Sequence, residues 1–246
     1  MKKILVIGES CHDVYQYGES NRLAPEAPVP VFNKGAQRNV TGGMAMNVYN
    51  NIKSISNHEV TLLTNKNYED ITKTRFVDTR TNYVILRLDE NDENYERINV
   101  RSHDYSKFDA VVISDYNKGF LTKDEISYIA NNSNVSFLDT KKLLGSWVKK
   151  ISYIKINDFE YERTKERIDD EIRKKLIITC GPSGAKYLDQ SFPVPKVEIK
   201  DTSGAGDTFI AGLVSNYINT GNIKDAIRFA NECATIVVQK KGVNIR

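Results

Sequence analysis

The sequence predicts an α/β protein with a mostly parallel β-sheet between two layers of helices, a three-layer α/β/α arrangement. Short apolar runs alternate along the chain with amphipathic stretches, which is the rhythm of strand and helix in a parallel sheet. The apolar runs show no in-out alternation, as expected of strands buried on both faces. The chain has 246 residues, of which 40% are hydrophobic, and this composition suits a single globular domain over residues 1–246.

Five apolar runs are predicted strands, and polar or glycine residues follow each of them at once. The runs are Lys3–Ile7, Ala110–Ile113, Val135–Leu138, Tyr153–Ile156 and Leu176–Thr179. The residues that follow them are Gly8-Glu9, Ser114-Asp115, Asp139-Thr140, Asn157-Asp158 and Cys180-Gly181. Ligands of open α/β sheets bind beyond the carboxyl ends of the strands, so we expect one shared site there. The alternative for any one of these segments is that the chain simply reaches water where a strand ends.

Three helices are predicted from apolar residues that recur with a period near 3.6 or from a capping signal. The first begins after Gly43, and its apolar face consists of Met44, Val48, Ile52 and Ile55. The second follows a capping-box pattern formed by Thr122 and Glu125. The third ends before Gly242, and its apolar face consists of Ile223, Ile227, Ala230, Ala234 and Val237. We interpret these faces as core.

Two segments depart from this rhythm and are predicted to form a small β lid beside the main sheet. Val14–Phe32 contains three of the six prolines and is interpreted as extended chain. Asn82–Leu88 alternates like a half-exposed strand. We expect the lid to be formed by about residues 14–32 and 75–90.

Charge and cysteine content narrow the class of protein. The 35 Lys and Arg residues against 32 Asp and Glu give a net charge of +3 without a basic block, so no nucleic-acid partner is expected. The three cysteines, Cys11, Cys180 and Cys233, suggest neither a disulfide framework nor a zinc site. The apolar run near the N-terminus is too short for a signal peptide or a membrane span. We therefore expect a cytoplasmic protein with no membrane partner.

The segment from Lys200 to Phe209 is the most informative for chemistry. Gly204 and Gly206 permit a tight turn, and the residues from there to about Asn219 suit a helix. Amides at a helix start attract anions, so the turn can hold a developing phosphoryl charge, and Asp207 can accept the proton of an attacking hydroxyl. A helix N-terminus stabilises the charged carboxylate, which weakens it as a base. The alternative is a capped helix in which Asp207 only complements the helix dipole.

The string Asp201-Thr202-Ser203-Gly204-Ala205-Gly206-Asp207 resembles the signature of the ribokinase (PfkB) family of sugar kinases. The resemblance implies a ribokinase-like fold, ATP and Mg²⁺ as cofactors, and two functional groups of residues. Gly204, Ala205 and Gly206 would form an anion hole, with Asp207 as the catalytic base. Asp201 and Ser203 lie where many members bind a monovalent cation, so K⁺ is a further candidate cofactor.

Other positions agree with this family in order and spacing. Gly42 and Gly43 followed by Asn47 resemble its sugar-binding motif, and Asn157 with Glu160 resembles the pair that organises the Mg²⁺ water and the nucleotide phosphates. The resemblance places the nucleotide on Thr179, Gly181, Gly184 and Asn231. Read singly, each is also explained without function, as a helix-terminal glycine pair or a solvated side chain.

The N-terminal segment resembles the start of the D-glycero-β-D-manno-heptose 7-phosphate kinases, most specifically in the string Pro25-Glu26-Ala27-Pro28-Val29-Pro30. By this resemblance the substrate is a sugar phosphate that is phosphorylated on O1, and Asp13 would bind its hydroxyls. A loop aspartate that caps the next turn is the alternative for Asp13. The phosphate needs cations, for which the candidates are Lys118, Arg22, Arg38, Arg80 and Arg87.

Three departures from that pattern qualify the resemblance. The chain is tens of residues shorter between about 57 and 74, Met44 and Met46 replace small or polar residues beside Asn47, and no adenylyltransferase half follows Arg246. We therefore expect a separate adenylyltransferase in the pathway. The resemblance also implies a homodimer in which the two lids pack together, with a lid folded onto its own domain as the alternative.

Two other functions are consistent with parts of the sequence. A kinase for another sugar or sugar phosphate is consistent with Met44 and Met46. A nucleotide- or sugar-binding protein without turnover is the hypothesis of a different class, against which Asp207 argues. A dinucleotide-dependent oxidoreductase is not expected, because the segment after the first strand lacks the glycine spacing of such a site.

Overall fold

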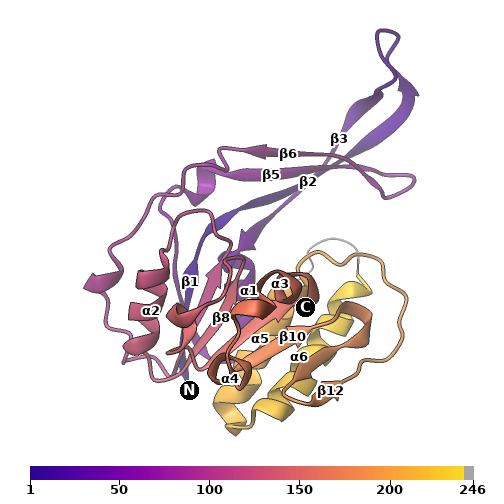
Figure 1. Ribbon diagram of the computed structural model, residues 1–246. Helices are drawn as coiled ribbons and strands as arrows, with labels where there is room; N and C mark the ends of the chain where they lie inside the picture. The colour runs from indigo at the N-terminus through magenta and orange to yellow at the C-terminus, as the bar shows by residue number, and fades with distance from the viewer. Residues whose placement is uncertain (241–246) are drawn as a thin grey trace.

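The computed structural model describes residues 1–240 and contains an eight-stranded main sheet and a four-stranded second sheet (Figure 1). The main sheet has the strand order β12-β11-β10-β9-β8-β7-β1-β4. Its strands are β1 (Lys3–Gly8), β4 (Glu59–Leu63), β7 (Ala110–Asp115), β8 (Ser136–Thr140), β9 (Tyr153–Asn157), β10 (Leu176–Thr179), β11 (Ala185–Tyr187) and β12 (Gln190–Phe192). Neighbours from β4 to β10 are parallel, whereas β11 and β12 are antiparallel additions. All five predicted strands are present, and the predicted α/β class is confirmed.

Helices cover both faces of the main sheet. They are α1 (Ala45–Ile55), α2 (Lys123–Asn131), α3 (Asp158–Thr164), α4 (Asp170–Arg173), α5 (Ala205–Thr220) and α6 (Ile223–Val238). The 3-10 turns are η1 (Tyr68–Asp70), η2 (Val100–Ser102), η3 (Ser146–Val148), η4 (Lys165–Arg167) and η5 (Gly181–Ser183). Gly242, before which the last helix is predicted to end, lies outside the described residues.

Alternate residues of the central strands face opposite helix layers. On β1, Leu5 and Ile7 belong to the apolar cluster that contains Ile126 of α2. Ile4 and Val6 belong to the other cluster, which holds the buried faces of α1, α5 and α6. Because both faces of these strands are buried, they appear in the sequence as continuous apolar runs.

The helix starts show the predicted capping box of α2 and two further features, a second capping box and a left-handed glycine. Thr122 and Glu125 form the predicted capping box at the start of α2. Asn157 and Glu160 form a second capping box at α3, which is also the segment that resembles the family's Mg²⁺ motif. Helix α5 begins after Gly204, whose φ of 75° lies in the left-handed region that favours glycine.

The second sheet, which we call the lid sheet, rises from the end of β1 and extends away from the helical layers (Figure 1). Its strands are β2 (Ser10–Leu23), β3 (Pro30–Met44), β5 (Thr72–Asp78) and β6 (Val84–Glu90), in the order β3-β2-β5-β6. The sheet is larger than expected, since β2 and β3 form a long antiparallel hairpin that reaches Met44. The expectation of continuous extended chain over Val14–Phe32 is wrong at residues 24–29, where Pro25 and Pro28 lie in the loop because proline cannot donate to a strand ladder.

The shortened region around residues 57–74 still completes the edge of the main sheet. Strand β4 pairs in parallel with β1, with Lys3 opposite Glu59. The chain then passes through η1 into β5 of the lid sheet. Across residues 1–240, none of the helices has the length and apolar character that crossing a membrane requires.

Candidate active site

A cavity of about 720 Å³ lies beyond the carboxyl ends of β8, β9 and β10. It receives residues from three of the five predicted strand exits, namely Asp139, Asn157 with Asp158, and Gly181. The predicted site residues that line it are Asn157, Thr179, Gly181, Gly184, Gly204, Ala205, Gly206, Asp207 and Asn231. The fold therefore brings the signature turn and the nucleotide residues of the resemblance into one cavity.

Asp207 lies in the first turn of α5 and is 7% exposed. Asn47 Nδ2 of α1 donates to its Oδ2 at 2.8 Å. The hydroxyl of Tyr116, in the loop after β7, donates to its Oδ1 at 2.7 Å. Asn51 supports this arrangement from the next turn of α1 by donating to Thr208 Oγ1 at 3.2 Å. Asn47 and Asp207, which two separate motifs singled out, are thus in contact.

Burial dominates the electrostatics of Asp207. It raises the pKa of this carboxyl to about 6, although the hydrogen bonds from Asn47 and Tyr116 lower it. The negative charge of Asp139 raises this pKa further, and the ammonium of Lys155 lowers it. The helix N-terminus was expected to weaken Asp207 as a base, but desolvation outweighs it and leaves a carboxylate that titrates close to neutral pH.

A buried ion pair lies below the signature turn. Lys155 Nζ is 2.8 Å from Asp139 Oδ2, and both side chains are almost fully buried. A Cβ atom at Gly206 would lie 3.0 Å from this Nζ, so the glycine leaves room for the ammonium. Among residues 1–240, Asp139 Oδ1 has no hydrogen-bond partner. Both side chains line the cavity.

Asn157 and Glu160 are held by each other. Glu160 N donates to Asn157 Oδ1 at 2.7 Å, and Asn157 N donates to Glu160 Oε2 at 2.9 Å. The other carboxylate oxygen of Glu160 accepts from Lys141 Nζ. Lys141 lines the cavity and lies over the ring of Tyr116, 5.7 Å from its centroid. Lys141 and Asn157 line the cavity wall, and Glu160, which is not among the lining residues, holds both of them from behind. An ammonium and an amide at the wall with a carboxylate next to them suit a phosphate with a hydrated divalent ion.

The remaining residues predicted to bind the nucleotide or a monovalent cation make hydrogen bonds within the protein. Asn231 Nδ2 donates to the carbonyl of Phe192 at 2.8 Å and so fastens α6 to β12, while its side chain lines the cavity. Thr179 Oγ1 contacts the carbonyl of Ile156 at 3.4 Å. Ser203 N donates to Asp201 Oδ1 at 2.8 Å in the segment before α5.

The predicted sugar-side residues lie at the root of the lid sheet, outside this cavity. Asp13 Oδ1 is 2.8 Å from Arg75 Nη1. A Cβ atom at Gly43 would lie 2.8 Å from Cys11 Sγ and 3.0 Å from Asp13 Oδ2, so only glycine allows β3 to pass this closely. Gly42 makes room in the same way for the side chain of Met46. The methionine noted as a departure thus packs against the glycine pair.

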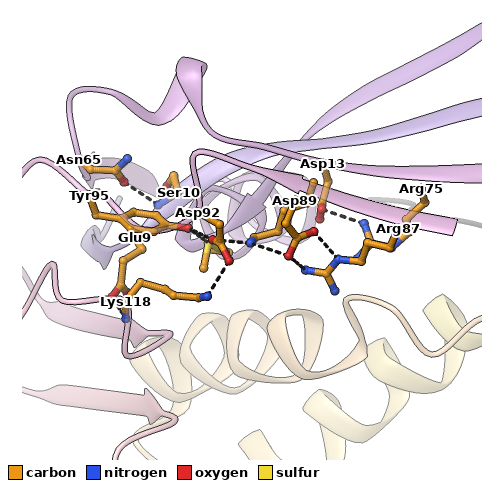
Figure 2. Close-up of polar contacts among 12 residues, drawn as sticks. Glu9, Ser10, Asp13, Asn65, Arg75, Arg87, Asp89, Asp92, Tyr95 and Lys118 are labelled. Carbon is orange, nitrogen blue, oxygen red and sulfur yellow. Dashed lines mark hydrogen bonds and ion pairs between the residues drawn. The ribbon is translucent and has the colours of Figure 1, made fainter.

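A row of charges, which we call the lid charge row, lies along one face of the lid sheet and continues to Asp92 after β6 and to Lys118 in the loop after β7. It consists of Asp13, Lys73, Arg75, Arg87, Asp89, Asp92 and Lys118 (Figure 2). Strand register places Asp13, Lys73 and Asp89 side by side. Lys118 Nζ is 2.6 Å and Lys73 Nζ 2.5 Å from Asp92. Burial acts to raise the pKa of Asp92, but hydrogen bonds from Lys118, Lys73 and Tyr95 lower it to about 2.

The phosphate candidates are distributed unevenly. Lys118 and Arg87 belong to the lid charge row, whereas Arg22, Arg38 and Arg80 are exposed elsewhere on the lid sheet. Lys73 and Arg75 were not among the candidates. The sequence did contain a signal for them. Lys73 and Arg75 alternate with Thr74 and Phe76 on one strand, so the two cations lie on the same face of the sheet.

Sequence reasoning also missed Tyr116, Lys141 and Lys155 in the cavity. Lys155 had a signal, since a lysine inside the apolar run Tyr153–Ile156 has to be paired when that strand is buried on both faces. The roles of Tyr116 and Lys141 had none, because they depend on which strands are neighbours.

The fold is that of ribokinase-like enzymes. Ribokinase from Thermotoga maritima superimposes with a TM-score of 0.72 at 16% identity, covering 99% of this chain and 95% of that one. Ribokinase from Arabidopsis thaliana, in complex with ribose and ATP, gives a TM-score of 0.67 at 14% identity, covering 98% and 94%. Fold and family together define a phosphotransferase that acts on a sugar hydroxyl.

The chain belongs to the PfkB carbohydrate kinase family. Residues 62–246 match the family described as pfkB family carbohydrate kinase. The bifunctional protein HldE of Helicobacter pylori strain G27 is 30% identical over 296 aligned positions, covering 98% of this chain. This chain spans 64% of the length of that relative. The family resemblance of the signature string is confirmed.

Proposed function

We propose that this kinase uses ATP and Mg²⁺ to phosphorylate O1 of D-glycero-D-manno-heptose 7-phosphate, giving the 1,7-bisphosphate, a precursor of ADP-heptose. The observation that carries the proposal is Asp207, a buried carboxylate that joins the cavity to Asn47 on the sugar side. The relatives named HldE and the string Pro25–Pro30 support a heptose phosphate as the substrate.

The cavity fits a nucleotide. Its volume of about 720 Å³ lies within the range typical of small-molecule sites, and its wall combines apolar residues with three lysines, Lys141, Lys155 and Lys196. Thr179, Gly181, Gly184 and Asn231 would contact ATP there. Asn157 and Glu160 would hold Mg²⁺ through water, and the ion would neutralise charge on the phosphates. Asp201 and Ser203 are the candidates for K⁺.

Asp207 would accept the proton of the attacking hydroxyl. Each of its oxygens already accepts one hydrogen bond and retains a further lone pair for the sugar. The amides of Gly204 and Gly206 at the start of α5 would stabilise the charge of the transferring phosphoryl group, while the amide of Ala205 donates to the carbonyl of Thr202 at 3.2 Å. Lys155 adds a positive charge close to Gly206. Positioning and electrostatic stabilisation are the main requirements of phosphoryl transfer.

The substrate's own phosphate would bind at the lid charge row. Lys118 and Arg87 are the partly exposed cations there, with side chains 37% and 46% exposed. Asp13, beside Gly43, would contact the sugar hydroxyls. A kinase that draws on ATP and a sugar phosphate would work in the cytoplasm.

The test is a panel of sugars and sugar phosphates, including both anomers of the heptose 7-phosphate, assayed for ADP release with Mg²⁺-ATP. We expect the heptose 7-phosphate to give the highest kcat/KM, and ³¹P NMR of the product to locate the new phosphate on C1. Turnover of a different sugar alone would favour the alternative substrate, for which Met46 against Gly42 is the motivating contact. The kinase proposal fails if nothing in the panel is phosphorylated.

Activity is expected to fall in acid as Asp207 becomes protonated. Its pKa of about 6 lies above the ordinary value, so the base is ionised above that pH and lost below it. The profile of kcat/KM between about pH 5 and pH 9 reports the free enzyme, and we expect an acid limb centred near its pKa. A profile that stays flat through this region would contradict the assignment.

The outer face of the lid sheet is proposed to pair with a second copy of the chain. Val84, Leu86 and Leu88 alternate along β6 on the face opposite to Arg87 and Asp89, and are 52%, 57% and 43% exposed. A two-fold contact is self-complementary and would cover both patches at once.

Charged substitutions at Val84 on this face and at Val29, which is 51% exposed in the loop between β2 and β3, are expected to break a dimer into monomers. Light scattering should give twice 27.9 kDa for the wild type and 27.9 kDa for the double variant. Leu188→Glu, at an equally exposed residue on the β11–β12 turn, is the matched control. A monomeric wild type would rule out the dimer, and a dimer unaffected by both charges would place the interface elsewhere.

A further inference from the structure

We propose that Tyr116, held in place by Glu9, is a positioning residue that acts through its hydroxyl on Asp207 and sets the pH range in which this carboxylate works. The inference rests on the proposed function, in which Asp207 is the base. It concerns the loop from Tyr116 to Gly119, between β7 and α2.

The loop is fixed by one buried carboxylate. Glu9, immediately after β1, is fully buried. Its Oε2 accepts from Tyr116 N and its Oε1 from Lys118 N, each at 2.9 Å. Between them Asn117 has a φ of 59°, so the chain turns sharply between the two amides. Glu9 thereby fixes the backbone of Tyr116 and Lys118, whose side chains point in different directions.

Those two side chains serve the two halves of the site. The hydroxyl of Tyr116 reaches Asp207 Oδ1. Lys118 Nζ instead reaches Asp92 in the lid charge row (Figure 2). A displacement of the loop would therefore disturb Asp207 as well as the lid charge row. The Glu9 carboxylate bonds to neither Asp207 nor Asp92, and it acts on both through the loop that it holds.

Toward the ionised Asp207 carboxylate, which has no proton to donate, the Tyr116 hydroxyl can act only as a donor. Burial, and after it the charges of Asp207 and Asp139, hold the pKa of its hydroxyl well above the usual value. The hydroxyl therefore stays protonated and donates to the charged form of Asp207. A hydrogen bond to the charged form lowers the pKa of a carboxyl, which opposes the effect of burial.

The other groups that face Asp207 come from three elements. Asn47 of α1 donates to Oδ2, Asp139 of β8 raises the pKa of Asp207, and Lys155 of β9 lowers it. Lys141, after β8, also senses the charge of Asp207. Asp139 and Lys155 are paired with each other, act on this pKa in opposite directions, and each change it less than either hydrogen bond does. The hydrogen bonds from Asn47 and Tyr116 are thus the main counterweight to burial.

The decisive variant is Tyr116→Phe, which keeps the ring and removes only the donor. We expect the acid limb of kcat/KM to move up by about one pH unit, the scale of a lost hydrogen bond to a charged group. The loss of rate should be about tenfold below the wild-type midpoint and small at alkaline pH. Tyr153→Phe, which removes a hydroxyl bonded to Tyr217 at 3.3 Å, is the matched control and should leave the profile unchanged.

A readout without turnover separates this inference from the proposed function. The ¹³C resonance of the Asp207 carboxyl, assigned by its loss in Asp207→Asn, reports the titration directly. We expect the same upward shift of its pKa in Tyr116→Phe, and a shift of the same sign in Glu9→Gln. An upward shift in a protein that phosphorylates no sugar would retain the positioning role and reject the kinase proposal.

Two results would overturn the inference. One is an Asp207 titration in Tyr116→Phe that coincides with the wild type, whatever the activity. The other is a pH profile lowered equally at every pH, which is the signature of a structural role alone. Additive shifts in the Glu9→Gln, Tyr116→Phe double variant would refute the part assigned to Glu9, since Glu9 acts through Tyr116.

Discussion

Asp207→Asn is expected to lower kcat by about two to four decades, the usual contribution of general-base catalysis, while ATP binding stays largely intact. Asparagine preserves the shape of the side chain and both contacts, because its oxygen can accept from Asn47 while its amide donates to the hydroxyl oxygen of Tyr116. What it removes is the ability to take up a proton. The loss is therefore expected in kcat rather than in the binding of the nucleotide.

The measurements are kcat from ADP release and the Kd of ATP from calorimetry. Asp225→Asn is the matched control, since Asp225 also lies in the first turn of a helix but pairs with Arg228 on the surface. It should leave both quantities unchanged. If Asp207→Asn kept even a third of the wild-type kcat, Asp207 would not be the base.

Lys155→Met is expected to destabilise the fold by about 3–5 kcal/mol, the range found when one partner of a buried ion pair is removed. Asp139 would be left charged in an interior site where, among the described residues, Oδ1 already has no partner. Urea unfolding without nucleotide measures the loss, because bound ATP would add stability of its own.

Two further variants make this prediction specific. Lys155→Met combined with Asp139→Leu removes both charges and should recover most of the stability. Lys149→Met removes a lysine that also has two carboxylate partners, but on the surface, and should have little effect. A loss for Lys155→Met no larger than that for Lys149→Met would show that the buried pair contributes little.

The parts of the fold that were predictable share one physical property, which is burial on both faces. The strands β1, β7, β8, β9 and β10 appear in the sequence as continuous apolar runs, and α1 and α6 as apolar stripes. Strand β3 was missed beyond Phe32, since most of its residues are exposed and its pairing with β2 is what makes it a strand. Strands β11 and β12 have three residues each, too few for a periodic signal.

The residues of the site also fall into those that the sequence could reveal and those that it could not. Asp207, Gly206 and Asn157 could be found because each lies in a short motif whose meaning is local. Tyr116 could be quoted but not given a role, because its hydroxyl meets Asp207 only when β7 and α5 are placed in space. The lid charge row depends on the register of β2, β5 and β6, which sequence patterns do not determine.

The way in which the β2–β3 hairpin is attached has a mechanical consequence. Only Glu9 separates β1 from β2, and β3 runs through Met44 straight into α1. The carbonyl of Glu9 accepts from Ala45 N at 2.8 Å, so the two attachments are tied together. The hairpin is therefore joined to the main domain without a flexible linker, and β5 supports it along one side by pairing with β2. A movement of the hairpin at its base would reach Glu9 and Asn47, the residues that hold Tyr116 and Asp207.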